Sequence, residues 1–350
     1  MSPDGPASAN RKRIRIAAGA LSVVGAVVAI LALAGVFAGG NDDDDDDDEP
    51  PEAAAPSPQE PPVDGAAPEA GGGRKPQVTT IRVGGRPTAV AAGQDGVWVA
   101  DSFSRRATVL DSEARQAEPK RFSLAGPASD VTVGESGAWY ALPEQQAVER
   151  RELGDPEAPG ETIGVEGFPA AVAAADGTVY GLSERSVELI DPDSGEVADR
   201  FDVEGFASSL AVGDGFVWVV KDNREVVRVD PASGGIDGDP VEVPEAFGVA
   251  TGEGAVWIVS ASGEVTRIDP GSLQTATPRA RIRGALDVAA GLGSVWVTSS
   301  NRKLTRLDPD TLEPTGKPIP VGDEAASVSV GAQAVWVANG GDGTLTRIQP

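Results

Sequence analysis

The run Phe216-Val217-Trp218-Val219, placed directly after the turn sequence Gly213-Asp214-Gly215, decides the fold because closely similar runs occur six more times in the chain. The aromatic residues of the seven runs are Trp98, Trp139, Tyr180, Trp218, Trp257, Trp296 and Trp336, at successive intervals of 41, 41, 38, 39, 39 and 40 residues. All six tryptophans of the protein occupy this one position. Seven units of this length, rich in β-branched residues and Gly/Pro turns, predict an all-β, seven-bladed β-propeller.

Each unit contains the pattern of a four-stranded blade. A first strand ends in Gly, the second carries the aromatic residue, and the third ends in Asp-Pro, as in the stretch VVRVDP at residues 226–231. Pro presets φ in the turn that follows, and Asp caps its backbone. The first two units lack this Asp-Pro, so their third strands are predicted less firmly. A fourth strand is expected at the blade edge, as over residues 120–124 and 197–203.

The order of the strands predicts how the ring closes. The repeat region begins on a fourth-strand segment, residues 78–83, and ends on a third-strand segment, residues 344–348. The first segment can therefore complete the seventh blade, which joins the two ends of the domain without a covalent bond and covers a free edge. Gly-x-Gly sequences such as Gly213-Asp214-Gly215 lack the third Gly and the helix of a dinucleotide site, and are interpreted as hairpin turns.

The region before the repeats divides into three segments. Residues 1–15 end in the basic cluster Arg11, Lys12, Arg13 and Arg15, and residues 16–40 carry no charge. A run of this length can span a bilayer as one helix, and the preceding positive charges favour a cytoplasmic N-terminus with the remainder outside. A cleaved signal peptide is the alternative, supported by small residues near Ala32 and Ala38. We favour an uncleaved anchor, because secretory apolar runs extend over only about 7 to 15 residues.

Residues 41–76 are expected to be a disordered linker, because seven aspartates followed by Pro, Ala, Glu and Gly contain almost nothing that can be buried. Asp42 to Asp48 could trap a divalent cation. We favour a solvated spacer between membrane and propeller, since calcium sites need ligands at set offsets around a Gly-assisted turn.

Composition excludes several classes of function. The 350 residues include no His and no Cys, so Ser-His-Asp and Cys-His catalysis, ordinary zinc sites and disulfides are absent. A net charge of -25 argues against a nucleic-acid partner, because duplex binding requires Lys and Arg to neutralise phosphates. No cofactor is predicted.

The stretch Val335-Trp336-Val337-Ala338-Asn339, followed by GTLTRI at residues 343–348, resembles the YncE-type and streptogramin (virginiamycin B) lyase-like propellers of bacteria. The resemblance covers about residues 77–350 and implies the blade architecture. Members of the lyase group use histidine and a magnesium ion at the top face. With no histidine here, the resemblance implies no lyase activity and no lyase residue can be assigned. Related sensor propellers are attached to a cytoplasmic kinase, which about 15 residues before the helix could not supply.

Candidate binding residues lie in loops at the face where propellers usually bind ligands. The loops that lead into first strands and those that join second to third strands supply Arg86, Asp101, Asp130, Lys221, Asn223, Asp287, Asn301 and Asn339. Asp130 and Asp287 each precede the aliphatic residue that starts the pattern of their unit, in blades two and six, and are expected to face one another across the channel. They could bind a cation or polar ligand, or act as an acid/base pair. We favour solvated channel residues or loop caps, and the metal ligands stay unknown.

Two classes of function remain. The first is a membrane-anchored extracytoplasmic scaffold that binds a protein or a small polar ligand. The second is a hydrolase or lactonase that depends on carboxylates and a metal. The row of tryptophans could form an aromatic ligand cage, but we favour a blade-to-blade core, since every unit has an aromatic residue there.

Overall fold

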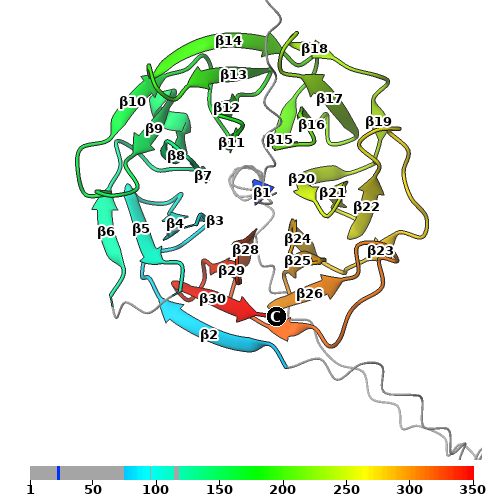
Figure 1. Ribbon diagram of the computed structural model, residues 1–350. Coiled ribbons are helices and arrows are strands. Elements are labelled where there is room, and N and C mark those ends of the chain that lie inside the picture. Colours follow the sequence, from blue (N-terminus) through cyan, green and yellow to red (C-terminus); the bar gives the residue numbers. More distant parts are fainter. Residues whose placement is uncertain (1–21, 24–74, 95, 114–117) are drawn as a thin grey trace, which may run out of the picture.

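The computed structural model describes residues 22–23, 75–94, 96–113 and 118–350. Seven antiparallel sheets stand around a central axis as blades (Figure 1). The prediction of an all-β, seven-bladed propeller is therefore confirmed. Nearly all of the predicted N-terminal segment, membrane span and linker lie outside the described residues.

In blades 1 to 6 the four strands that the repeat predicts follow one another outward in chain order. Blade 1 consists of β3 (Ala89–Ala92), β4 (Gly96–Ala100), β5 (Arg106–Asp111) and β6 (Lys120–Ser123). Blade 2 consists of β7 (Asp130–Gly134), β8 (Gly137–Leu142), β9 (Ala147–Arg151) and β10 (Glu161–Gly164). Blade 3 consists of β11 (Ala171–Ala175), β12 (Thr178–Leu182), β13 (Ser186–Asp191) and β14 (Glu196–Asp202). The third strands of the first two blades thus form without Asp-Pro.

The fourth strands become short in blades 4 to 6. Blade 4 contains β15 (Ala207–Gly213), β16 (Phe216–Lys221), β17 (Glu225–Asp230), β18 (Gly235–Ile236) and β19 (Val241–Glu242). Blade 5 contains β20 (Ala246–Gly252), β21 (Ala255–Ser260), β22 (Glu264–Ile268) and β23 (Ala280–Arg281), and blade 6 contains β24 (Ala285–Gly291), β25 (Ser294–Ser299), β26 (Lys303–Leu307) and β27 (Ile319–Pro320). Prolines at 240, 278, 314 and 318 interrupt these edges, because Pro cannot donate to a strand ladder.

Blade 7 closes the ring as the sequence predicts. Its inner strands are β28 (Ala325–Val330), β29 (Val335–Asn339) and β30 (Thr344–Gln349), and β2 (Gln77–Arg82) pairs antiparallel along the whole of β30. The strand from the start of the domain lies outside the last strand of the chain (Figure 1). The outer edge of β30 is therefore covered by β2.

The inner hairpins of blades 4, 5 and 6 turn as the Gly-x-Gly sequences predict. In blade 4, Asp214 and Gly215 both have positive φ, 55° and 81°, which is the requirement of a type I′ turn. The indole N–H of the next tryptophan then reaches back over the turn, with Trp218 Nε1 donating to the Gly213 carbonyl at 3.3 Å and Trp257 Nε1 to the Gly252 carbonyl at 2.8 Å. One local motif therefore sets both the turn and the tryptophan.

In blades 2 and 4 to 7 the tryptophan of the second strand pairs with an arginine of the third. Trp257 pairs with Arg267 and Trp296 with Arg306 in register, and the Arg306 guanidinium lies 5.3 Å from the Trp296 ring centre. Some of these arginines also join neighbouring blades, since Arg228 Nη1 donates to the Pro270 carbonyl of the next Asp-Pro turn at 2.6 Å. All six tryptophans are at most 2% exposed. These rings are packed in the interior and line no open cage.

The two described residues of the predicted membrane segment form β1 (Ser22–Val23), at the centre of the ring (Figure 1). They pair antiparallel with Ala250 and Val249 of β20. The other residues of the predicted helix, 16–21 and 24–40, lie outside the described residues, so the membrane helix stays a prediction. The inner edge of a first strand offers unpaired backbone groups to which an extended segment can add. In the described part of the chain, no helix has the length and apolar character needed to cross a bilayer.

Truncation of Trp257 tests how much the buried aromatic row contributes. Trp257 is 0% exposed, so Trp257→Ala is expected to lower the free energy of unfolding by about 3 to 5 kcal/mol. Trp257→Phe keeps an aromatic ring but removes the hydrogen bond from the indole N–H to the Gly252 carbonyl. The free energy of unfolding should therefore fall by about 1 kcal/mol more than the lost buried apolar area alone would cause. Urea denaturation measures both. A cost below about 1 kcal/mol for the alanine variant would contradict a core role.

Candidate functional site: the channel and the loop face

Asp130 and Asp287 are buried residues that join neighbouring blades. They are 2% and 0% exposed. Asp130 Oδ2 accepts the backbone N–H of Val172 in blade 3 at 2.9 Å, and Asp287 Oδ2 accepts that of Val328 in blade 7 at 2.8 Å. The interpretation of these two carboxyls as solvated channel residues or loop caps is wrong, because each bonds to an innermost strand about 41 residues further along the chain.

Burial changes the protonation of both groups. Loss of water raises the pKa of Asp130 from 3.8 to about 7, against the opposing effect of the Val172 and Val131 N–H groups. The pKa of Asp287 is raised well above its usual value, chiefly by burial, and the charge of Asp130 adds a smaller repulsive contribution. Both carboxyls therefore take up protons more readily than an exposed aspartate does.

Hydroxyl groups at neighbouring positions make the same kind of bond. The Ser327 hydroxyl accepts the Val90 N–H at 3.4 Å, and the Ser329 hydroxyl accepts the Ala92 N–H at 3.1 Å, which connects blade 7 to blade 1. Thr251 donates to the Val212 carbonyl at 2.9 Å between blades 4 and 5. Polar side chains on innermost strands thus serve to join blades.

Asp101 and Asn339, predicted on the ligand face, are also buried, at 8% and 0% exposure. Asp101 accepts the N–H groups of Arg86 and Phe103 at 3.1 and 2.9 Å. Asn339 Oδ1 accepts the Gly322 N–H at 3.1 Å, and its amide donates to the hydroxyls of Thr344 and Thr346. Both side chains hold inter-blade loops in place, so their hydrogen-bonding capacity is used within the fold.

Lys221 ends strand β16, and Asn223 and Asn301 lie in the turns between second and third strands. Asp222 and Asn223 have positive φ values of 52° and 50°. Asp and Asn tolerate this left-handed conformation better than other residues with a side chain, so both fit a turn that requires two such residues. Lys221 Nζ donates to the Glu204 carbonyl at 2.9 Å. Asn301 Oδ1 accepts the Ser299 hydroxyl at 2.8 Å. The structure does not bring these three residues together with the Asp130–Asp287 pair.

Arg86 remains as an exposed charged residue on the predicted face. Its guanidinium binds Glu324 Oε2, with Nη2 at 2.8 Å, and lies 4.4 Å from the centre of the Phe103 ring. Arg86 and Glu324 occupy equivalent positions, four residues before the recurring aliphatic residue, in blades 1 and 7. Arg86 belongs to an inter-blade loop, and Phe103 belongs to the loop between the second and third strands of blade 1. Because they are in contact, the two kinds of loop lie at the same end of the ring.

That end carries exposed aromatic side chains that the sequence interpretation missed. Phe103 and Phe168 are 52% exposed and Phe206 is 41% exposed. Phe168 and Phe206 occupy the position equivalent to Arg86 in the adjacent blades 3 and 4, and Phe103 follows the second strand of blade 1. The sequence contains a signal for these exposed rings. The equivalent loop positions of blades 1 and 7 carry the charged residues Arg86 and Glu324, and a phenylalanine at such a position leaves an apolar ring in water. We call Phe168 and Phe206 the phenylalanine pair.

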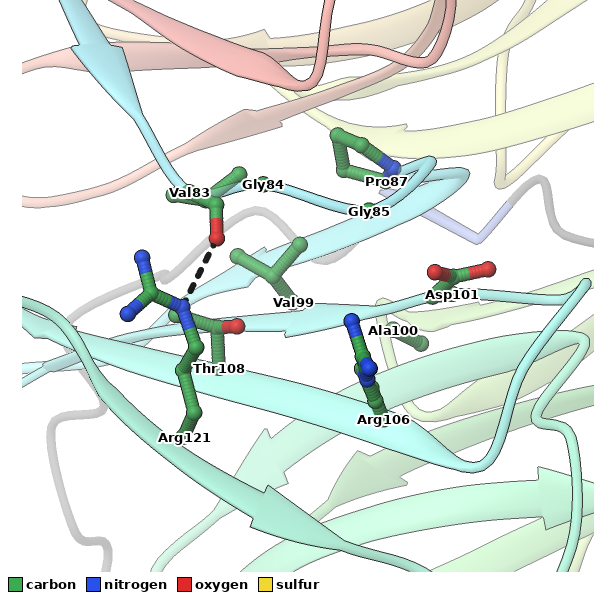
Figure 2. A pocket seen from close by; sticks show the side chains of 10 residues that line it. All are labelled: Val83, Gly84, Gly85, Pro87, Val99, Ala100, Asp101, Arg106, Thr108 and Arg121. Atoms are coloured by element: carbon green, nitrogen blue, oxygen red, sulfur yellow. Dashed lines mark hydrogen bonds between the residues drawn. The ribbon is translucent and has the colours of Figure 1, made fainter.

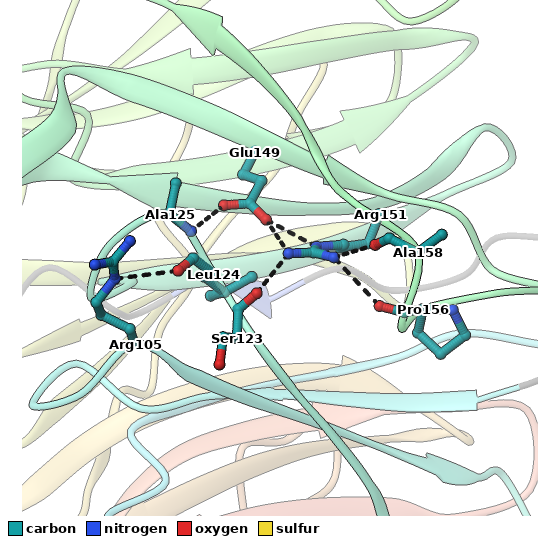
Figure 3. Close-up of polar contacts among 8 residues, drawn as sticks. All are labelled: Arg105, Ser123, Leu124, Ala125, Glu149, Arg151, Pro156 and Ala158. Atoms are coloured by element: carbon teal, nitrogen blue, oxygen red, sulfur yellow. Dashed lines mark hydrogen bonds and ion pairs between the residues drawn. The ribbon is translucent and has the colours of Figure 1, made fainter.

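A buried ion pair at the seam of blades 1 and 2 was also missed (Figure 3). Arg151 Nε and Nη2 bind Glu149 Oε1 at 2.8 and 2.6 Å, and Arg151 also donates to the carbonyls of Ser123 and Ala158. Glu149 Oε2 accepts the Ala125 N–H at 2.6 Å. Both charged side chains are at least nine-tenths buried, and the positive charge of Arg151 is balanced by the negative charge of Glu149. The group holds the loop into blade 2 and is a structural element.

Blade 3 has the same carboxyl without the arginine. Glu188 Oε1 accepts the Glu166 N–H at 2.6 Å, while Oε2 has no hydrogen-bond partner. Burial raises the pKa of Glu188 to about 7. Among the described residues, no group of three or more Asp or Glu side chains is gathered in a way that could hold a metal ion.

The comparisons with known proteins support the fold. No protein-family model and no curated protein matches the sequence. Among solved structures, hydrazine synthase of Kuenenia stuttgartiensis is 14% identical with a TM-score of 0.59, over 75% of this chain and 95% of that chain. BamB from Moraxella catarrhalis is 14% identical with a TM-score of 0.54, over 75% and 85% of the two chains. The WD40 β-propeller domain of Doa1 is 11% identical with a TM-score of 0.62, over 76% and 93%. At these identities the likeness defines a β-propeller protein and nothing finer.

Asp130 predicts a measurable pH dependence of stability. Its folded-state pKa of about 7 lies above the ordinary 3.8, so the folded protein holds more protons between these values. The free energy of unfolding should therefore fall as pH rises from about 4 to about 7. Asp130→Asn keeps an oxygen for the Val172 N–H and should lose part of this slope, with Asp287 supplying the rest.

Urea unfolding across this pH range measures the slope. Asp130→Ala serves as the comparison, because it also removes the titrating carboxyl but leaves the Val172 N–H unpaired. It should show the same reduced slope and be about 1 to 3 kcal/mol less stable than Asp130→Asn at every pH. A slope in the asparagine variant identical to that of the wild type would contradict a raised pKa at this position.

Proposed function

We propose that this chain is a membrane-anchored, extracytoplasmic β-propeller that binds a protein partner on the loop face carrying the phenylalanine pair. The observation that carries the proposal is that two large aromatic side chains are exposed on the inter-blade loops of two adjacent blades. Aromatic residues are enriched where proteins contact one another, and exposed apolar groups gathered on one face favour a docking role. The relation to YncE-type propellers suggested by the repeat sequence belongs to this proposal.

The anchor is proposed from the sequence of residues 16–40, which carry no charge and follow four basic residues. Residues 41–76 would then act as the spacer that separates the propeller from the membrane surface. An anchor in the bilayer would withdraw Ser22 and Val23 from β20, so the two placements of this segment exclude each other.

An enzymatic function depending on carboxylates and a metal is the alternative class. The geometry favours it less, because the oxygens of Asp130, Asp287 and Asp101 accept backbone N–H groups within the fold. The loop face provides a contact surface in which charged side chains of both signs surround exposed aromatic rings.

Membrane anchorage predicts that the full chain stays with the membrane fraction after carbonate washing. Protease added outside intact cells should digest the propeller or its linker. Release of the protein by carbonate with the N-terminal sequence intact would favour the channel placement of Ser22 and Val23. A new N-terminus near Gly39 would show that the segment is a cleaved signal peptide.

Partner binding is tested by site-specific cross-linking in intact cells. A photoreactive amino acid at Phe168 or at Phe206 should give one discrete cross-linked product. The matched control is Ile236, which is also exposed, at 41%, but lies on the outer edge of blade 4. No product at the phenylalanine pair, or the same product from Ile236, would contradict docking at the loop face.

A further inference from the structure

A cavity of about 350 Å³ lies at the seam between blade 7 and blade 1 (Figure 2). Its walls come from the loop after β2 and from β4, β5 and β6. The lining residues are Val83, Gly84, Gly85, Pro87, Val99, Ala100, Asp101, Arg106, Thr108 and Arg121. This volume is at the lower end of the range for small-molecule sites, about 300 to 1,000 Å³.

Comparison of the repeats shows which side chain stands at the equivalent place in other blades. Thr108 pairs with Val99, Glu149 with Tyr140 and Glu188 with Gly181, so the three residues occupy one position in the third strands of blades 1, 2 and 3. In blades 2 and 3 that position carries a buried carboxylate, which accepts an N–H from the incoming loop. Thr108 is too short to reach as far. Blades 5, 6 and 7 carry Thr266, Thr305 and Thr346 at this position, so the carboxylate is particular to blades 2 and 3. Blade 1 has its cavity at the place where those two blades hold a carboxylate.

The cavity is also positively charged. Arg106 from β5 and Arg121 from β6 flank the loop that begins at Val83 (Figure 2). Arg121 Nε donates to the Val83 carbonyl at 3.0 Å, and the described residues provide no ion-pair partner for Arg121 and no polar partner for the Arg106 guanidinium. Arg106 and Arg121 are both exposed, so their guanidinium groups are open to an anion from solution. The carboxylate of Asp101 is engaged by two backbone N–H groups.

We propose that this cavity binds a small organic carboxylate. The ligand carboxylate would take the place that the Glu149 side chain fills in blade 2, with the Arg106 guanidinium and the Thr108 hydroxyl as donors. An arginine fork matches the two oxygens of a carboxylate. Val83, Pro87 and Val99 offer an apolar surface to a short hydrocarbon body. The site is separate from the phenylalanine pair and does not depend on the partner proposed for it.

The location gives the ligand an effect on ring closure. Val83 to Pro87 connect β2, the outer strand of blade 7, to β3, the inner strand of blade 1. A carboxylate held between this loop and β5 would link the closing strand to the blade that follows it. Because such a ligand binds only the folded ring, it stabilises the protein by mass action.

The experiment uses the full chain in nonionic detergent, with sodium acetate, propionate and benzoate as probes and sodium chloride at equal ionic strength as the reference. We expect a saturable rise in melting temperature with the carboxylates beyond that with chloride. Isothermal titration should give a Kd that rises about tenfold or more in Arg106→Gln, the loss expected for one charge-assisted hydrogen bond. Arg185→Gln is the matched control, an exposed arginine in the loop before the third strand of blade 3, and should leave Kd unchanged.

Thr108→Glu provides a second test, because it supplies within the chain the carboxylate of blades 2 and 3. This variant should fold, melt no lower than the wild type and no longer respond to carboxylates. Three results would overturn the proposal: equal shifts with chloride and carboxylates, a carboxylate response unchanged in Arg106→Gln, or a response to inorganic phosphate without one to carboxylates. If Thr108→Glu does not fold, the comparison of Arg106→Gln with Arg185→Gln still tests whether carboxylates bind in the cavity.

Discussion

Closure of the ring by β2 against β30 is the interaction on which the remaining structure depends. Seven sheets that pack face to face bury their tryptophans only if the last sheet also meets the first. The chain has no cysteine, so no disulfide fixes this junction, and backbone pairing along six residues of β2 replaces it. The seam between blades 7 and 1 is consequently the place where a local change affects the whole domain.

Most polar residues that look functional in the sequence form hydrogen bonds at the seams between blades. A first strand exposes backbone N–H groups at its inner edge, and an Asp or Ser from the preceding blade can reach them. Such a bond supplies a partner for a buried polar group, whose desolvation would otherwise cost about 1 to 3 kcal/mol. Burial also raises the pKa of such a carboxyl, as at Asp130. A raised pKa is typical of acid/base catalysts, but here the carboxyl joins two blades.

Differences between equivalent positions carry the information about binding. The tip of the inter-blade loop is Arg86, Phe168, Phe206 or Glu324 in different blades, and only the aromatic members leave a large apolar surface in water. Likewise, one third-strand position is Thr in blades 1, 5, 6 and 7 and becomes Glu149 beside Arg151 in blade 2 and Glu188 alone in blade 3. In blade 1 a cavity lies beside this threonine, Thr108. The common scaffold makes each departure from the repeat interpretable as a local change in charge or volume.

The sequence by itself determined the number of blades, the hairpin turns and the closing strand, because these follow from the period of the tryptophans, from residues such as Asp214-Gly215, and from the order of strands. Only the tertiary structure decided that Asp130 and Asp287 are buried, that Glu149 meets Arg151 under the loop of Ala125, and that space remains above Thr108. The physical reason is that backbone N–H partners belong to a neighbouring blade or its connecting loop. Whether a carboxyl finds such a donor, an arginine or water depends on how blades stack, which no local pattern specifies.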